Sequence, residues 1–314
     1  MPRVAVLLMG PTGAGKTDLA LRLVERLPLE IVSADSALVY RGMDIGTAKP
    51  AAAVRARVPH HLVDIRDPAE RYSAGDFVRD AGRAIGGIWA RGRIPLLVGG
   101  TMLYFHALTE GIAELPEGDP DLRASIDAEA ARVGWAALHE ELRRIDPASA
   151  TRIHANDPQR IQRALEVHRL TGATISELRT RRTAALADVR YLEFAVAPAR
   201  RAELHTALAA RFDAMMRAGL LDEVRHFYRR ADLTREHPSM RAVGYRQLWQ
   251  HLDGVWPLNV AVDAAVAASR QLAKRQWTWL RRRAGARWLD PACGNARPTV
   301  ADVVAAEIEA LDSR

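Results

Sequence analysis

The sequence predicts an α/β protein in which a parallel sheet is flanked by helices and carries an all-helical insertion. Short apolar runs alternate with stretches of helical spacing in the first hundred residues, a pattern typical of a parallel sheet. Residues 118–182 contain helical stretches only, and a strand-like run at Tyr191–Val196 then returns to the sheet. We therefore expect a core domain of residues 1–117 and 183–314, with a helical insertion domain at 118–182.

Four apolar runs before the insertion are expected to be strands. The first is followed by a glycine-rich turn, Gly10–Thr17, and by helical spacing over Asp18–Arg26. The second ends at Asp35 and the fourth at Gly99-Gly100-Thr101, while His60 and His61 lead into the third. Because functional loops of a parallel sheet follow the carboxyl ends of its strands, these endings are candidate site positions. The strands are predicted at Val4–Met9, Glu30–Ala34, Leu62–Ile65 and Ile94–Val98.

Asp-Pro pairs mark the helix starts of the insertion. In each pair the aspartate can cap the helix and the proline can occupy its first position. On the helix opened by the third pair, four residues mark the packing face, so Gln159, Arg160 and Arg163 are expected on the exposed side. The pairs are Asp119–Pro120, Asp146–Pro147 and Asp157–Pro158, and the packing face is Ile161, Ala164, Leu165 and His168.

The charge of the chain is moderately basic. Of its 314 residues, 45 are Lys or Arg and 38 are Asp or Glu, a net charge of +7, which is compatible with a nucleic-acid partner without establishing one. Only Lys16, Lys49 and Lys274 are lysines. In so arginine-rich a chain a retained lysine indicates a place where a compact ammonium group is needed.

The composition excludes several classes of protein. The one cysteine, Cys293, cannot form an internal disulfide, which favours a reducing compartment. No apolar run is long enough to span a bilayer, and the first residues lack the pattern of a secretory signal. We therefore expect a cytoplasmic protein with no membrane partner.

The glycine-rich turn matches the pattern G-x-x-x-x-G-K-[ST] in full and lies between a predicted strand and a predicted helix, the context of a P-loop. Its backbone N–H groups and the helix N-terminus form a nest for a di- or triphosphate. Lys16 can reach the terminal phosphate oxygens, and the Thr17 hydroxyl can ligate Mg²⁺. A chance glycine-rich turn is the alternative. The residues predicted to bind phosphate are Gly10, Pro11, Thr12, Gly13, Ala14, Gly15, Lys16 and Thr17.

Two strand ends supply candidate catalytic groups. Asp35 can act as a general base beside an electrophile held by its phosphates, or serve as a magnesium-sphere or helix-capping residue. Thr101 can donate a hydrogen bond from its hydroxyl, or cap the helix that follows it. A basic stretch, Arg270–Arg283, has no acidic residue, and it is either an RNA contact or a solvated helix face.

With these motifs in place the sequence resembles the tRNA dimethylallyltransferases, also called tRNA isopentenyltransferases. The resemblance covers almost the whole chain in order. It is carried by GPTGAGKT (10–17), DSALVYRGMDIGTAKP (35–50), HHLVDIRDP (60–68), YSAGDF (72–77), IPLLVGGTMLYF (94–105), NDPQRIQRALEV (156–167), SMRAVGYRQLW (239–249) and RQLAKRQWTWLR (270–281). Ala37 and Leu38 depart from the Met-Gln pair common in the family.

The resemblance implies transfer of a dimethylallyl group from dimethylallyl diphosphate to the exocyclic amine of the adenosine 3′ of the anticodon, in tRNAs that read codons beginning with U. It implies that the P-loop binds the diphosphate, although such loops are usually described as nucleotide- or ATP-binding. Asp35 and Thr101 would be catalytic, and a monomer would hold the tRNA anticodon stem-loop with its insertion domain. The implied tRNA-contacting residues are Asp35, Ser36, Ala37, Leu38, Thr101, Arg123, Gln159, Arg160, Ile161, Gln162, Arg163, Arg241, Ala242, Val243, Gly244, Tyr245 and Arg246.

Two other functions are compatible with a P-loop. A small-molecule kinase would use Asp35 to accept a proton from a hydroxyl, but a small acceptor does not need a large arginine-rich insertion. An RNA-binding ATPase would need a second apolar strand with a Walker B ending, and Asp35 supplies the one such ending in the sequence.

Overall fold

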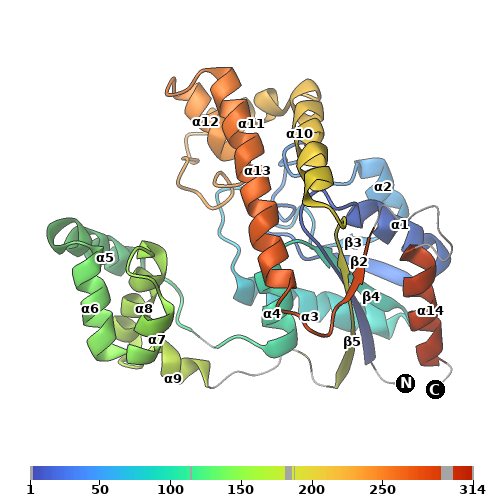
Figure 1. Ribbon diagram of the computed structural model, residues 1–314, viewed down its shortest axis with the longest axis horizontal. Coiled ribbons are helices and arrows are strands. Elements are labelled where there is room, and N and C mark those ends of the chain that lie inside the picture. The colour runs from blue at the N-terminus through green and yellow to red at the C-terminus, as the bar shows by residue number, and fades with distance from the viewer. Residues whose placement is uncertain (1–2, 114, 181–185, 187, 291–299, 313–314) are drawn as a thin grey trace. The chain divides into compact units, whose positions relative to one another are not determined.

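The computed structural model describes residues 3–113, 115–180, 186, 188–290 and 300–312 (Figure 1). It divides into two compact units, Met1–Ala107 with Leu186–Arg314, and Leu108–Ala185. The second unit begins at Leu108, within a helix. The sequence predicts the boundary at 118, where the alternation of strand and helix patterns gives way to helical patterns only. The predicted boundary at 182/183 and Cys293 lie outside the described residues.

The first unit is built on a parallel sheet of six strands in the order β3-β2-β4-β1-β5-β6. Residues Val6–Met9 of β1 lie in register with both neighbouring strands, as Val6 does with Leu96 and Leu192. The predicted α/β class, a P-loop-type parallel sheet flanked by helices, is confirmed. The strands are β1 (Arg3–Met9), β2 (Leu29–Ser33), β3 (His60–His61), β4 (Ile94–Gly99), β5 (Val189–Val196) and β6 (Arg287–Leu289).

Helices cover both faces of the sheet. The connection from β1 to β2 through α1 (Lys16–Arg26) and that from β3 to β4 through α3 (Ala74–Ala90) cross the sheet in opposite directions. Because such connections are right-handed, α1 and α3 lie on opposite faces. Leu19 and Leu23 of α1 pack on the sheet together with Val304 of α14 (Val300–Asp312). The reversal of direction leaves a crevice at the carboxyl ends of β1 and β4, where ligands of such sheets bind.

A second apolar core lies among the helices of the chain after β5. Phe212, Leu220, Tyr245 and Leu248 are buried there against Val39 and its neighbours, so the segment after β2 is packed against these helices. The remaining helices of this unit are α2 (Ala52–Arg57), α4 (Met102–Glu110, which crosses into the second unit), α10 (Arg201–Arg217), α11 (Leu220–Tyr228), α12 (Tyr245–Leu252) and α13 (Leu258–Leu280).

The strand predicted at Leu62–Ile65 is wrong. Leu62 and Asp64 have φ of 65° and 58°, left-handed values that interrupt an extended chain. The Ile65 N–H donates to the Val39 carbonyl at 2.9 Å, so this segment pairs with the loop after β2 instead. The sheet strand is the preceding pair, His60–His61. The three-residue β6 has no predicted counterpart in the sequence.

The helical unit confirms the three Asp-Pro helix starts. Asp119, Asp146 and Asp157 each cap a helix through a carboxylate that accepts backbone N–H groups. Ile161, Ala164 and Leu165 are buried in its core. His168 and Arg163 are both half-buried, which corrects the expectation that one packs inside and the other is exposed. The helices are α5 (Pro120–Val133), α6 (Trp135–Ile145), α7 (Pro147–Arg152), α8 (Pro158–Thr171) and α9 (Ile175–Arg179), drawn in green (Figure 1).

In the part of the chain that the structure describes, no helix combines the length and the apolar character needed to cross a membrane.

Candidate active site

The P-loop joins β1 to α1 through two glycines in the left-handed conformation. Gly13 and Gly15 have φ of 79° and 76°, values that a residue with a Cβ adopts only with strain. A Cβ at Gly10 would overlap the Val196 carbonyl oxygen of β5. The N-terminus of α1 has no side-chain cap, so its first N–H groups are free to bind an anion. This geometry suits a phosphate group.

Lys16 extends back along the loop that precedes it. Its Nζ donates to the Pro11 carbonyl at 2.8 Å. Burial lowers the pKa of Lys16 to about 8, while the Asp35 carboxylate opposes this shift and the Arg211 guanidinium adds to it. A bound anion would stabilise the charged ammonium, so the site gains most from a ligand with a high negative charge.

The ends of β2 and β4 are joined by side-chain hydrogen bonds. Asp35 accepts the Ala37 N–H on Oδ1 at 2.8 Å, which fixes its carboxylate in a turn. The Thr101 hydroxyl accepts the Ser36 N–H at 3.0 Å, and the Thr101 N–H donates to the Ala34 carbonyl at 3.2 Å. The two predicted catalytic residues, Asp35 and Thr101, are therefore held on adjoining loops.

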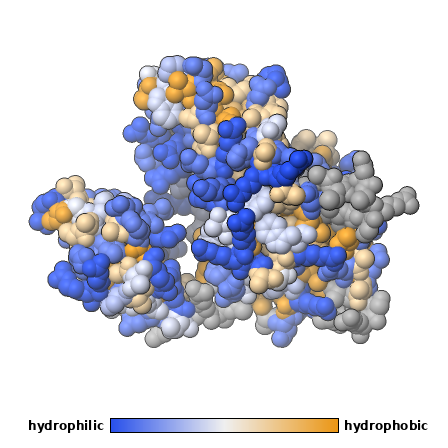
Figure 2. Space-filling view, viewed as in Figure 1, coloured by the Kyte–Doolittle hydropathy of each residue, from blue (hydrophilic) through white to orange (hydrophobic). Residues whose placement is uncertain are grey.

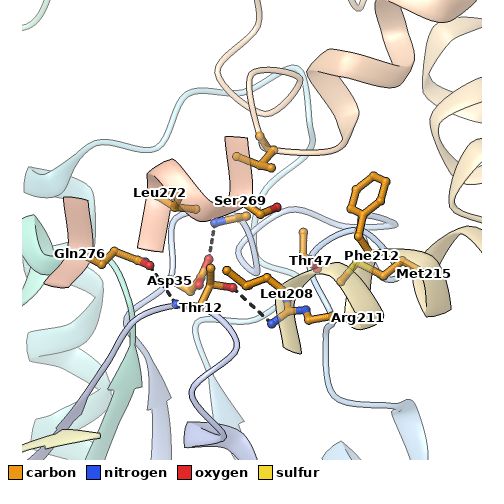
Figure 3. A pocket seen from close by; sticks show the side chains of 14 residues that line it. Thr12, Asp35, Thr47, Leu208, Arg211, Phe212, Met215, Ser269, Leu272 and Gln276 are labelled. Atoms are coloured by element: carbon orange, nitrogen blue, oxygen red, sulfur yellow. Dashed lines mark hydrogen bonds between the residues drawn. The ribbon is translucent and has the colours of Figure 1, made fainter. Parts of the chain in front are cut away.

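Asp35 lines a cavity of about 110 Å³ beside the P-loop (Figure 3). Thr12 and Arg211 line the same cavity, so a carboxylate, a guanidinium and a hydroxyl face it together. The walls supplied by α10 and α13 are largely apolar. An apolar cavity of about 150 Å³ binds benzene, so this space suits a small hydrocarbon group next to a charged one. The apolar wall consists of Leu208, Phe212, Met215 and Leu272.

Sequence reasoning missed the contributions of α10 and α13. Arg211 donates to the Thr12 hydroxyl at 3.2 Å, and burial lowers its pKa while Asp35 opposes that shift. Gln276 on α13 accepts the Thr12 N–H at 2.9 Å. Both lie about 200 residues or more from the P-loop in sequence, so no local motif connects them with it. The signal available in the sequence was an arginine next to the apolar spacing of α10, at Leu208 and Phe212.

The segment Tyr40–Lys49 forms another wall of the cavity through Gly46 and Thr47. Lys49 fixes the end of this segment, and its side chain is only 1% exposed. Its Nζ donates to the Tyr40 carbonyl at 2.8 Å, to Asp44 at 2.6 Å and to Asp64 at 2.5 Å. One retained lysine thus sits where a compact cation serves three acceptors.

The segment Arg241–Arg246, one of the predicted RNA-contacting segments, has mixed surroundings. Ala242 and Val243 line the cavity, and the two arginines are exposed. Tyr245 is fully buried and donates its hydroxyl to Glu223, so this side chain supports the segment from inside. In the helical unit, predicted Ile161 is likewise fully buried.

Two predicted RNA-contacting arginines share one buried carboxylate in the helical unit. Glu166, which is 0% exposed, accepts Arg123 Nε at 2.8 Å and Arg163 at 2.5 Å. Arg163 also donates to the Pro116 carbonyl at 2.6 Å. Arg160 is exposed, with its Nε 3.4 Å from an oxygen of its own cap, Asp157. Gln159 is also exposed, and Gln162 donates to Asp127 at 2.6 Å.

The basic stretch on α13 divides into exposed and packed residues. Arg270, Lys274 and Arg275 are exposed, and hydrophilic residues gather over this helix (Figure 2). Leu280 is buried, whereas Trp277 is half-buried with the Arg201 guanidinium 5.8 Å from its ring. The helix therefore buries one face and leaves a row of cations on the other.

The donor set at the P-loop fits Mg²⁺ held together with a phosphorylated ligand. Thr17 is exposed at the start of α1 and offers a hydroxyl oxygen beside the phosphate nest. Mg²⁺ keeps several waters and often takes only one or two protein oxygens when phosphates supply the rest. Among the described residues there is no group of three His, Cys, Asp or Glu that could hold a metal by protein ligands alone.

Comparison with known proteins places the chain in a family. Residues 38–283 match the family model described as IPP transferase. The protein is 55% identical over 306 residues to the tRNA dimethylallyltransferase of Bordetella pertussis (strain Tohama I), an alignment that covers 97% of this chain and 98% of the relative. The chain belongs to the IPP transferase family. Its curated relatives are named as enzymes, and the protein is a transferase.

Solved structures of IPP transferases resemble this one. The full-length tRNA isopentenylpyrophosphate transferase from Bacillus halodurans is 38% identical, with a TM-score of 0.67 over 92% of this chain and 90% of that one. A eukaryotic dimethylallyltransferase acting on tRNA is 24% identical, with a TM-score of 0.83 over 99% of this chain and 80% of that one, and it shows the shared fold.

Proposed function

We propose that the protein transfers a dimethylallyl group from dimethylallyl diphosphate to the exocyclic amine of the adenosine 3′ of the anticodon. The product would be N6-isopentenyladenosine in tRNAs that read codons beginning with U. The observation that carries this proposal is the cavity in which Asp35, the edge of the P-loop and an apolar wall meet. A donor with a charged head and a branched five-carbon tail matches those surroundings.

The diphosphate is proposed to bind the N–H groups of the P-loop and Lys16. Its negative charge rises as the allylic carbon leaves, so donors fixed in advance stabilise the transition state more than the bound substrate. Losing one such donor costs on the order of 10²–10³ in rate. Mg²⁺ bound at Thr17 would supply further positive charge to the leaving group.

The adenine amine is a weak nucleophile because its lone pair is delocalised into the ring. In the proposed reaction the nitrogen forms a bond to the allylic carbon, the carbon–oxygen bond breaks, and its electron pair leaves with the diphosphate. The proton lost by the nitrogen passes to the Asp35 carboxylate, whose neighbour Ala37 fixes one of its oxygens. General-base help of this kind is worth roughly 10²–10⁴ in rate.

The acceptor is proposed to be the anticodon stem-loop of tRNA. The target base must leave its stack to reach the cavity, which is the problem that base-flipping enzymes solve. Arg160 in the helical unit and the exposed cations of α13 supply phosphate-binding charge. Because tRNA is the proposed substrate and one chain offers both sites, we place the activity in the cytoplasm and in a monomer.

The comparisons do not favour the small-molecule kinase, whose donor would be ATP. A transfer assay separates the two functions. Labelled dimethylallyl diphosphate and γ-labelled ATP are each incubated with the protein, Mg²⁺ and unmodified tRNA, and the label on the RNA is counted. The proposal expects the prenyl label on an adenosine next to the anticodon and no phosphoryl label. RNA without a prenyl label would overturn the proposal, whether or not ATP labels the RNA.

A further inference from the structure

Gln276 connects the P-loop to the end of β4. Its Oε1 accepts the Thr12 N–H at 2.9 Å, and its Nε2 donates to the Gly100 carbonyl at 2.8 Å (Figure 3 shows the first bond). The residue reaches both partners from α13, 264 and 176 positions away in sequence. The structure thus places one side-chain amide between the loop proposed to hold the donor and the loop that carries Thr101.

The two bonds require a side chain that both accepts and donates, as an amide does. The same side chain must accept from a backbone N–H and donate to a backbone carbonyl, which neither a carboxylate nor a thioether can do. Gly100 leaves the space for it, because a Cβ there would overlap Gln276 Nε2 and would also lie 3.2 Å from the Gly10 carbonyl oxygen. The glycine of the Gly99-Gly100-Thr101 turn is therefore matched to the glutamine.

The bridge lies between the two groups that must meet in the reaction. On one side Thr12 is also held through its hydroxyl by Arg211. On the other side Gly100 precedes Thr101, whose hydroxyl accepts the N–H of the residue after Asp35. Hydrogen bonds and short stretches of backbone thus connect the phosphate nest to the carboxylate, and Gln276 is the link that crosses from one loop to the other.

We propose that Gln276 is a positioning residue that sets the distance between the bound donor and the base. This inference rests on the proposed function. Misplacement of reacting groups by about 1 Å can cost about 10²-fold in rate. Gln276 itself need not touch the reacting atoms, so its loss should lower the rate of transfer more than the affinity for either substrate.

The test compares Gln276→Met with Gln271→Met. Methionine keeps the length of the side chain and loses both hydrogen bonds, and Gln271 is exposed on the same helix. We expect the single-turnover rate of Gln276→Met to fall about 10- to 100-fold. The Kd for tRNA and the Kd for inorganic pyrophosphate should stay within about threefold of those of the unmodified protein. Gln271→Met should keep the original rate.

A second variant distinguishes positioning from general support of the fold. In Gln276→Glu a carboxylate can accept from Thr12 but cannot donate to Gly100, whereas the protonated acid can do both. The rate of this variant relative to the unmodified protein should therefore rise as the pH falls from 8 towards 5. Gln271→Glu adds the same charge at an exposed position and should give a flat ratio.

The outcomes separate this inference from the proposed function. If the unmodified protein transfers no prenyl group, the proposed function fails. If it does so and Gln276→Met reacts within threefold of its rate, the positioning role of Gln276 is overturned. If Gln276→Met does not fold, the pH series of Gln276→Glu decides, and a ratio that stays flat overturns the inference.

Discussion

The Glu223 carboxylate on α11 accepts the Ile45 N–H at 2.7 Å. The neighbouring N–H groups of Asp44 and Gly46 donate to the same carboxylate at 2.9 and 3.0 Å, and the Tyr245 hydroxyl donates to it as well. One acidic side chain thus satisfies three successive backbone donors. This fixes the segment that forms a wall of the active-site cavity.

Replacing Glu223 with glutamine should loosen that wall. The amide keeps one acceptor oxygen and presents N–H groups to backbone donors, which leaves half-buried donors such as the Ile45 N–H without a partner. We expect the free energy of unfolding to fall by about 1–3 kcal/mol and the KM for the prenyl donor to rise. Asp222→Asn, at a 78% exposed side chain of the same helix, is the matched control. Chemical denaturation and donor titration are the measurements, and unchanged values for both would contradict this role.

Lys49 should not be replaceable by arginine. Its ammonium group, on a side chain 1% exposed, donates to Tyr40, Asp44 and Asp64 at once, and the fixed fork of a longer guanidinium does not reproduce those three bonds. Removing the charge leaves Asp44 without this partner, Asp64 with Arg55 alone and the Tyr40 carbonyl without its donor, so Lys49→Met should cost about 1–3 kcal/mol of unfolding free energy. Lys49→Arg should also destabilise the protein, whereas exposed Lys274→Arg should not. Urea denaturation of the three variants checks this.

Donor affinity should decrease at alkaline pH through Lys16. Its pKa is lowered to about 8 in the free protein, so the ammonium loses its proton above that pH and an anionic ligand loses an attractive charge. Between pH 7 and 9 the affinity for inorganic pyrophosphate should therefore fall. Lys16→Arg stays charged throughout, so the ratio of the two affinities removes the titration of the ligand itself. A ratio that does not change with pH would rule out Lys16 as the titrating group.

Asp35 should be needed for the chemical step and not for RNA binding. The residue lies at the cavity between the P-loop and Thr101, where a carboxylate can accept the amine proton. In Asp35→Asn we expect the single-turnover rate to fall by roughly 10²–10⁴ with the Kd for tRNA nearly unchanged. Asp213→Asn, which removes an exposed carboxylate of α10, is the control. A rate within a few fold of the original would remove Asp35 from the base role.

The parts of the site that depend on local sequence were predictable. The P-loop follows from a fixed pattern between a strand and a helix, and the strand that precedes Asp35 follows from an apolar run. The apolar run Leu62–Ile65 predicts a strand wrongly, because apolar character alone does not fix an extended backbone. Its two left-handed residues instead place the Asp64 carboxylate next to Lys49. The hydrophobic periodicity of the sequence does not predict this ion pair.

The rest of the site depends on contacts between distant segments. Arg211 and Gln276 form hydrogen bonds with Thr12 from two distant helices. The apolar spacing of these helices predicts that each buries one face, but it does not predict which loop that face contacts. Arg163 is a second case in which local sequence does not predict the contact. The helical period places this residue next to solvent, but its guanidinium pairs with the buried Glu166 carboxylate three residues later. Charge pairing of this kind decides the orientation of a long side chain after the fold has formed.

This difference between Arg160 and Arg163 gives the last prediction. Arg160 is exposed, and a phosphate contact there would release counterions when RNA binds. In Arg160→Ala the slope of log affinity against log salt should become shallower by about 0.7–0.9 units, with the stability of the protein unchanged. Arg143→Ala, at an exposed arginine paired with Glu140, is the control.

Arg163→Ala should behave differently, because it leaves Glu166 at 0% exposure with one guanidinium fewer. A buried charge with no partner costs about 3–5 kcal/mol, and because Arg123 still holds Glu166 this variant should lower the stability of the helical unit by less than that. Arg123→Ala should have the same effect, and the double variant, which leaves the carboxylate with neither guanidinium, should cost more than the sum. Thermal unfolding and salt-titrated tRNA binding of the four variants separate the roles. If Arg163→Ala kept full stability and changed only the salt slope, the ion cluster would be a phosphate-binding surface and not a support.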